Sequence, residues 1–143
     1  MDFIVERALD NNASDDFANM SQANIKVIGV GGAGNNMVGW LYKKGIKGAE
    51  IIATNTDHQH LGITGADRKF LIGRDCTRGL GCGGFPNKGA EAAQESLAQL
   101  KESLKGSDMV FVCAGMGGGT GTGAAPVVAQ VAKDTGAIVI GTV

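Results

Sequence analysis

Residues 25–45 read IKVIGVGGAGNNMVGWLYKKG and join a short apolar run, a glycine-rich turn and an amphipathic stretch. Residues 25–30 predict a strand, and residues 35–44 predict a helix whose apolar side chains share one face. Two lysines occupy the last turn of this helix, and Gly45 supplies its stop. A strand that leads through glycines into a helix is typical of βα architecture.

The same alternation continues along the chain. Further strands are predicted from short apolar runs at residues 51–54, 69–72, 109–113 and 137–143. Helices are predicted at residues 88–104 and at residues 122–135, the second with Pro126 in its first turn. Strands that are apolar throughout are typically buried on both faces. The predicted fold class is therefore α/β, a doubly wound, mostly parallel sheet with helices on both faces.

The composition fits one globular domain, with 43% apolar and 19% charged residues among 143. Residues 1–23 are polar and acidic and predict a flexible arm, which leaves residues 24–143 as a domain that stops within its fifth strand. No apolar run approaches the roughly 18 residues of a membrane span, and the N-terminus lacks a secretory leader pattern. We therefore expect a soluble, cytoplasmic protein without membrane insertion.

Charge and cysteine content exclude further classes. The formal net charge is -1, so no global field favours nucleic acid as a partner. Three cysteines form no CxxC pair and leave an odd thiol, which favours a reducing compartment over a disulfide scaffold. Any anion must therefore be held by local geometry.

Glycine is in excess, with 24 residues, and it concentrates in three runs at residues 29–34, 79–84 and 115–123. The first run has the GxGxxG spacing directly after a strand, where glycine lets the backbone approach a phosphate. The third run has six glycines in nine residues. That number costs about 3 to 6 kcal/mol of chain freedom, which favours a nest of backbone N–H donors over a simple turn. Thr120 and Thr122 would add hydroxyl donors and cap the next helix.

The first and third runs contain no lysine or arginine. Two helix N-termini supply only about +0.5 each against roughly three or four negative charges on a nucleoside triphosphate, which implies a divalent cation. Asp57, just past a strand, is the candidate to hold Mg²⁺ through water, or it caps the helix that follows. The GxxxxGK[ST] pattern is absent, so this is not a P-loop site.

Residues 79–84 (GLGCGG) precede a helix and either close over a terminal phosphate, with Arg78 lending charge, or form an ordinary mobile loop. Cys82 is interpreted as a small filler rather than a nucleophile, because no histidine pairs with it in an evident motif. No catalytic residue is predicted within this chain.

Four motifs carry a resemblance to a known family. Residues 26–36 (KVIGVGGAGNN), 55–57 (NTD), 77–81 (TRGLG) and 114–126 (AGMGGGTGTGAAP) resemble, in order, the FtsZ cell-division GTPases of the tubulin superfamily. The family signature GGGTGTG stands at residues 117–123. The resemblance runs from about residue 25 to residue 143.

The resemblance implies a Rossmann-like GTPase domain that binds GTP or GDP with Mg²⁺. The predicted nucleotide-binding residues are Gly31, Gly32, Ala33, Gly34, Asn35 and Asn36; Asn55 and Asp57; Cys82, Gly83 and Gly84 of the γ-phosphate loop; and Gly117, Gly118, Gly119, Thr120, Gly121, Thr122 and Gly123.

Partners and location also follow from the resemblance. It implies head-to-tail filaments of the full-length protein at mid-cell, with membrane-tethering division proteins as indirect partners. Hydrolysis would need a carboxylate-bearing synergy loop from a neighbouring subunit, which this chain lacks. The chain also departs from the commoner family patterns. Residues 80–87 read LGCGGFPN where LGAGANPE is common, and residues 57–60 read DHQH where DAQA is common.

Two other functions remain open at this stage. GxGxxG with an acidic residue downstream also suits an NAD-dependent Rossmann oxidoreductase. Alternatively, the chain acts chiefly by association, capping or poisoning filaments.

Overall fold

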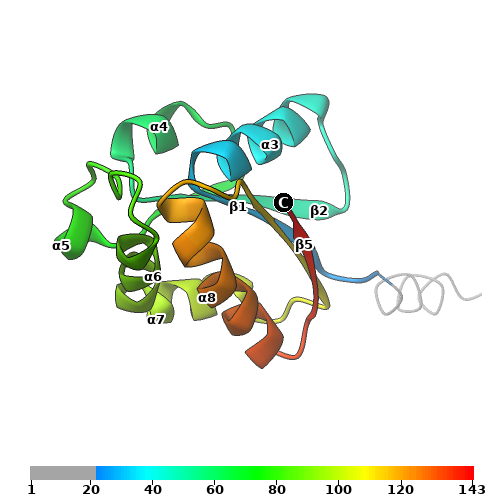
Figure 1. Ribbon diagram of the computed structural model, residues 1–143. Helices are drawn as coiled ribbons and strands as arrows, with labels where there is room; N and C mark the ends of the chain where they lie inside the picture. The colour runs from blue at the N-terminus through cyan, green and yellow to red at the C-terminus, as the bar shows by residue number, and fades with distance from the viewer. Residues whose placement is uncertain (1–21) are drawn as a thin grey trace, which may run out of the picture.

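The structure is a computed structural model that describes residues 22–143. In this part of the chain, five parallel strands form one sheet (Figure 1). The sheet order is β3-β2-β1-β4-β5, which confirms the predicted doubly wound arrangement. The predicted arm at residues 1–23 lies outside the described residues except for its last two. The strands are β1 (Ile25–Val30), β2 (Ala49–Asn55), β3 (Arg68–Leu71), β4 (Met109–Ala114) and β5 (Ile138–Thr142).

The central strand β1 pairs with β2 on one side and β4 on the other. Val30 is in register with both Thr54 and Ala114, so the carboxyl ends of the three strands lie at one level. The sheet order reverses between β1 and β4. In open α/β sheets, such a reversal leaves a crevice outside the carboxyl ends of the strands, where ligands bind.

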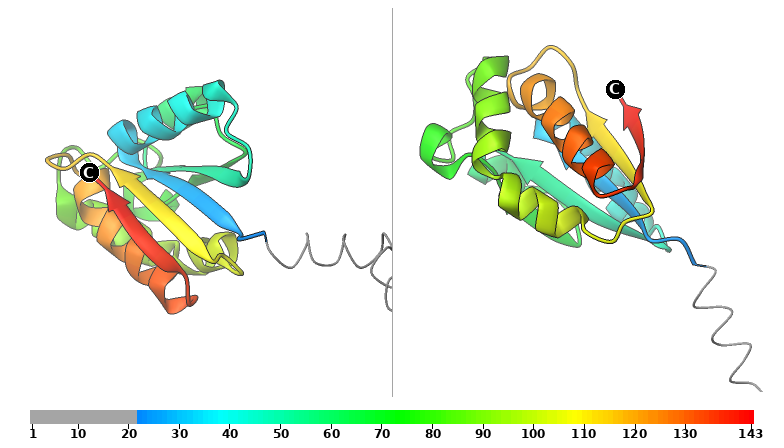
Figure 2. Two further views of the ribbon diagram at one scale, coloured as in Figure 1. Left: turned by 90° about the vertical axis from the view of Figure 1, so that its right-hand side faces the viewer. Right: turned by 90° about the horizontal axis from the view of Figure 1, so that it is seen from below.

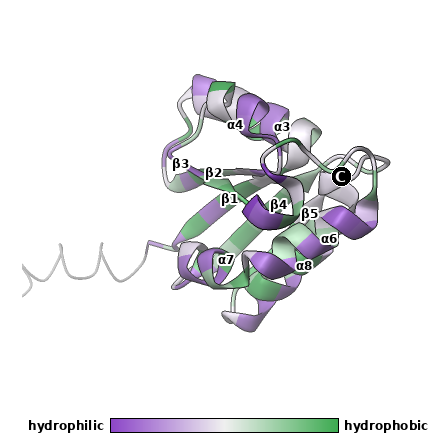
Figure 3. Cartoon of the chain, turned by 90° about the vertical axis from the view of Figure 1, so that its left-hand side faces the viewer, coloured by the Kyte–Doolittle hydropathy of each residue, from purple (hydrophilic) through white to green (hydrophobic). Residues whose placement is uncertain are grey.

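Helices cover the sheet from both sides, as Figures 1 and 2 show. Helices α3 (Gly31–Lys44) and α4 (His58–Ile63) lie on one face. The other face carries α6 (Pro86–Glu95), α7 (Leu97–Leu104) and α8 (Thr120–Asp134), with the short α5 (Arg74–Thr77) beside α6. Figure 3 shows apolar strands between helices that are polar on their outer sides.

Each face of the sheet has its own apolar core. Toward α6, α7 and α8, the fully buried side chains include Ile28, Ile52 and Leu100. Toward α3 and α4, Val38 and Leu61 pack on the sheet. Strands β1, β2 and β4 carry runs of buried residues, so the expectation of apolar, two-sided burial holds for these three inner strands. It is wrong for the edge strand β3, none of whose residues is buried. It is also wrong for the other edge strand, β5, whose residues are mostly exposed.

Three helix predictions need correction. The predicted helix at residues 88–104 is two helices that meet at Ser96, whose hydroxyl accepts a hydrogen bond from the Gly73 N–H at 3.0 Å. Helix α3 begins at Gly31, four residues early, because the chain turns into the helix directly at Gly31, whose φ of 76° is left-handed. Helix α8 begins at Thr120, so Pro126 lies in its second turn rather than its first.

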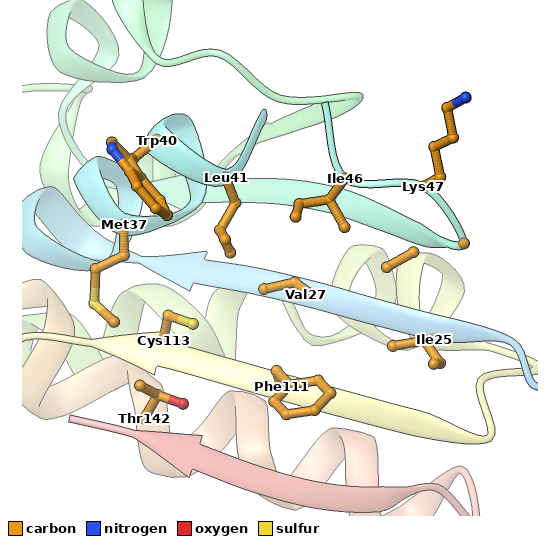
Figure 4. A pocket seen from close by; sticks show the side chains of 12 residues that line it. Ile25, Val27, Met37, Trp40, Leu41, Ile46, Lys47, Phe111, Cys113 and Thr142 are labelled. Carbon is orange, nitrogen blue, oxygen red and sulfur yellow. The ribbon is translucent and has the colours of Figure 1, made fainter. Parts of the chain in front are cut away.

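The face of the sheet that carries α3 is only partly covered. A groove of about 770 Å³ lies beside α3, with Val27 and Phe111 on its floor and Met37, Trp40 and Leu41 along one wall (Figure 4). Nearly all of its lining is apolar, so it offers few groups for chemistry. The polar cavity lies elsewhere, at the carboxyl edge of the strands.

Candidate functional site

A second cavity, of about 480 Å³, opens at the carboxyl edge of the sheet, where β1, β2 and β4 end. All three glycine runs contribute residues to its wall, which agrees with the prediction that they lie at one edge of the sheet. Its lining residues are Val30, Gly32, Ala33, Asn55, Thr56, Asp57, His60, Leu80, Gly81, Gly83, Gly115, Met116, Gly118, Gly119, Thr120 and Gly121.

Helix α3 presents its first turn to this cavity. It starts immediately after β1, at Gly31 with a φ of 76°, and no side chain of the described residues caps it. The first N–H groups of a helix have no partner within the helix, so those of Gly32 and Ala33 face the cavity as free donors. A Cβ on Gly31 would lie 2.8 Å from the Gly121 nitrogen, so only glycine lets the two helix starts come this close.

Helix α8 presents its first turn to the same cavity. Gly119 is its N-cap and makes no side-chain capping bond. The prediction that Thr120 and Thr122 cap this helix is wrong, because both hydroxyls have other partners. Thr122 Oγ1 accepts the Gly117 N–H at 2.9 Å and so holds the loop before the helix. Thr120 Oγ1 pairs with Thr56 Oγ1 at 2.7 Å across the base of the cavity.

The loop at residues 79–84 is fixed to the end of β2. The His58 N–H donates to the Gly79 carbonyl at 2.9 Å, and the Gly81 N–H donates to the Thr56 carbonyl at 3.1 Å. Cys82 is buried beneath the loop, with its Sγ 3.4 Å from Thr120 Oγ1 and 3.5 Å from Thr56 Oγ1. The burial of Cys82 agrees with its interpretation as a small filler, and Leu80, Gly81 and Gly83 of the loop form part of the cavity wall.

Within residues 22–143, Asp57 is the one carboxylate that lines the cavity, and no lysine or arginine of this range lines it. Its Oδ1 accepts the His60 N–H at 3.0 Å and so caps α4, which confirms the capping interpretation. This cap occupies one carboxylate oxygen and leaves Oδ2 for a ligand. Among the residues that the structure describes, no cluster of three or more His, Cys, Asp or Glu side chains could hold a metal by itself.

Half of the predicted binding residues lie on the cavity wall and half do not. The predicted residues that line it are Gly32, Ala33, Asn55, Asp57, Gly83, Gly118, Gly119, Thr120 and Gly121. Those outside the wall are Gly31, Gly34, Asn35, Asn36, Cys82, Gly84, Gly117, Thr122 and Gly123.

Several residues outside the wall serve packing. A Cβ on Gly34 would collide with the Cys113 carbonyl oxygen, and one on Gly123 with the Pro86 carbonyl oxygen. Asn35 is fully buried and donates from Nδ2 to the Thr54 carbonyl at 3.1 Å, so it ties α3 to β2. Asn36 lies on a separate cavity between α3 and α4.

Sequence reasoning missed seven lining residues: Val30, Thr56, His60, Leu80, Gly81, Gly115 and Met116. Gly81 and Gly115 stand inside the glycine runs, so the runs themselves were a sufficient signal. Thr56 stands between two predicted residues. His60 stands in the DHQH departure at residues 57–60, but only the turn of α4 brings it back toward the end of β2.

Comparison with known proteins now identifies the chain. The sequence model of the Tubulin/FtsZ family, GTPase domain, matches residues 24–143. The chain belongs to the Tubulin/FtsZ family. It is 61% identical to cell division protein FtsZ 2 of Methanocaldococcus jannaschii over 122 residues, which cover 85% of this chain and 32% of that protein. It is 59% identical to cell division protein FtsZ 1 of Archaeoglobus fulgidus over 119 residues, which cover 83% of this chain and 32% of that protein. The chain thus spans about a third of the length of these relatives.

Comparison with solved structures gives the same fold. An M. jannaschii FtsZ dimer superposes with a TM-score of 0.86 at 47% identity, over 94% of this chain and 40% of that one. A CetZ from Methanosaeta thermophila shares the fold, with a TM-score of 0.69 at 23% identity over 83% of this chain and 35% of that one. These matches give no support to the NAD-dependent oxidoreductase alternative. No helix within residues 22–143 is long and apolar enough to cross a membrane.

Proposed function

We propose that this chain is the GTP-binding part of an FtsZ-like GTPase, with residues 24–143 as its nucleotide-binding domain. The observation that carries the proposal is the meeting of two uncapped helix starts, those of α3 and α8, in one cavity. Free backbone donors at helix N-termini favour phosphate groups, and glycine keeps side chains out of the way.

Charge balance supports Mg²⁺ as part of the ligand. Among the described residues, no lysine or arginine lines the cavity, and two helix N-termini supply only about +0.5 each. Mg²⁺ commonly keeps several waters and binds through one or two carboxylates plus substrate phosphates. Asp57 fits this role, because its Oδ2 is left over from the cap of α4. Bound Mg²⁺ would neutralise phosphate charge, and Asp57 would hold it through water.

Hydrolysis and assembly are proposed for the complete protein. The resemblance assigns the completion of hydrolysis to a synergy loop from a neighbouring subunit, and no catalytic residue is assigned within this chain. Self-association into head-to-tail filaments is supported by relatives whose structures are described as an FtsZ dimer and a PhuZ filament. Membrane-tethering division proteins are proposed as indirect partners, and the cytoplasmic division site at mid-cell as the location.

Isothermal titration with GTP, ATP and NAD, each with and without Mg²⁺, tests the proposal. Gly118→Asp places a carboxylate in the cavity where a Cβ meets no atom within 4 Å. It should weaken GTP binding at least about tenfold, because the added negative charge repels the phosphates. Gly141→Asp, an equally open position on β5, is the matched control and should leave affinity within about twofold. Binding of NAD but not GTP, or equal affinities of the two variants, would refute the proposal.

A further inference from the structure

The amide of Asn55 determines which ring nitrogen of His60 carries a proton. Asn55 Oδ1 accepts two backbone N–H groups, from Thr56 at 2.8 Å and Asp57 at 3.3 Å. The amide can hold only one orientation with this pair of donors, so its Nδ2 faces His60. Asn55 Nδ2 lies 3.3 Å from His60 Nδ1. Because an amide nitrogen only donates, Nδ1 must accept, and the neutral ring carries its proton on Nε2.

His60 is also held in place by its backbone. Its N–H donates to Asp57 Oδ1 at 3.0 Å, and its carbonyl accepts the Thr64 hydroxyl at 2.9 Å. The residue is partly buried and lines the 480 Å³ cavity. It also lines the separate cavity between α3 and α4. With Nδ1 paired to Asn55, Nε2–H is the donor that the ring has left.

We propose that His60 is a ligand-contacting residue of this cavity, which donates from Nε2–H to an anionic oxygen of the bound nucleoside polyphosphate. The inference rests on the proposed function and deepens it. Apart from His60, the lining side chains that can donate are Asn55, Thr56 and Thr120, and each of these already pairs with another residue. A neutral donor adds to the backbone donors without opposing the Mg²⁺ charge near Asp57. The commoner family pattern has alanine at this position, which offers no side-chain donor.

Titration of three variants with Mg²⁺ and GTP at pH 8, where histidine side chains are ordinarily neutral, tests the contact. His60→Ala removes both ring nitrogens and should weaken binding about tenfold, as expected for one hydrogen bond to a charged group. His60→Asn can still pair with Asn55 but is too short to replace Nε2, and it should show the same loss. His58→Ala is the matched control, since His58 lies two residues away, is exposed and does not line the cavity. It should bind within about twofold of the unaltered chain.

Equal binding by His60→Ala and His58→Ala would overturn the proposal. So would full binding by His60→Asn, because the role of His60 would then be only to support Asn55. Long-range ¹H–¹⁵N spectra of the imidazoles provide a measurement on the unaltered chain, independent of variant folding. They should show His60 protonated on Nε2, with that nitrogen shifted by Mg²⁺ and GTP while His58 is not. A proton on Nδ1, or no shift at saturation, would contradict the inference.

The two proposals fail in different ways. If the unaltered chain does not bind GTP, the proposed function falls and the His60 contact falls with it. If the unaltered chain binds GTP and Gly118→Asp weakens binding, but His60→Ala does not, the proposed function stands and only the role of His60 is rejected.

Discussion

Cys76, which lies outside the candidate site, has a thiol whose pKa is raised in part by one neighbouring carboxylate, that of Glu95. Glu95 accepts the backbone N–H of Asp75 at 3.0 Å and that of Cys76 at 3.1 Å, and these two bonds lower the pKa of the Glu95 carboxyl. Burial, followed by the hydrogen bond and charge of Glu95, raises the pKa of Cys76 to about 11. The folded chain therefore favours the neutral thiol, and Cys76 is a poor nucleophile near neutral pH.

The raised pKa of Cys76 can be checked by alkylation with iodoacetamide, with the reaction at each cysteine followed by mass spectrometry. The rate at Cys76 should rise with a midpoint near pH 11, and Glu95→Gln should move that midpoint toward the ordinary thiol value by removing a negative charge. Since the folded pKa exceeds the unfolded one, the contribution of Cys76 to stability should be complete below the unfolded pKa. It should be lost as pH rises from there through about 11. A midpoint near the ordinary value in the unaltered chain would contradict this account.

At the scale of elements, glycine lets α6 and α8 touch backbone to backbone. A Cβ on Gly89 would collide with the Gly119 carbonyl oxygen, and one on Gly123 would collide with that of Pro86. The glycines of one signature thus divide into two groups. Gly118 and Gly119 line the cavity just before α8 begins, whereas Gly123 lies inside α8, where that helix packs closely against α6.

Gly123→Ala should therefore destabilise the fold by about 1 to 3 kcal/mol, because the added methyl group meets backbone that must move. Gly118→Ala adds the same group where no atom lies within 4 Å, and it should change stability by less than about 0.5 kcal/mol. Urea unfolding followed by circular dichroism measures both variants. Equal midpoints for the two variants would show that the close approach of α6 and α8 is not required.

At the scale of the whole molecule, the two faces of the sheet are covered unequally. Helices α6, α7 and α8 bury one face under a continuous core, whereas α3 leaves the apolar groove of Figure 4 open on the other. Met37 and Ile46 at this groove are 37% and 47% exposed. Contiguous exposed apolar surface of this kind takes up apolar probes.

The 143-residue chain should accordingly raise Nile red fluorescence while it retains its circular dichroism. The double variant Met37→Gln and Ile46→Gln should reduce that fluorescence severalfold, because both changes make the groove more polar. Ile63→Gln is the control, since Ile63 is 85% exposed but lies outside the groove. A similar loss of fluorescence in the control would place the dye elsewhere.

The order of strands and helices was readable from local signals. Apolar runs without alternation predict strands buried on both faces, and glycine or lysine marks where helices such as α3 end. The gathering of the glycine runs at one edge followed from parallel strands alone. The helix break at Ser96 could not be predicted in this way. The Ser96 hydroxyl accepts a hydrogen bond from the Gly73 N–H, 23 residues away, and no local sequence pattern shows that the helix ends there.

By itself, the sequence determined the fold class, the family and the edge of the sheet where backbone donors collect, because periodicity and glycine spacing act over a few residues. Only the tertiary structure decided which of those glycines line the cavity and which let two helices pack closely, since that depends on how near distant parts of the backbone come to each other. The same is true of His60. Its single free donor follows from Asn55, Thr56 and Asp57 being folded against it, a relation among four side chains and backbones that spacing along the chain does not contain.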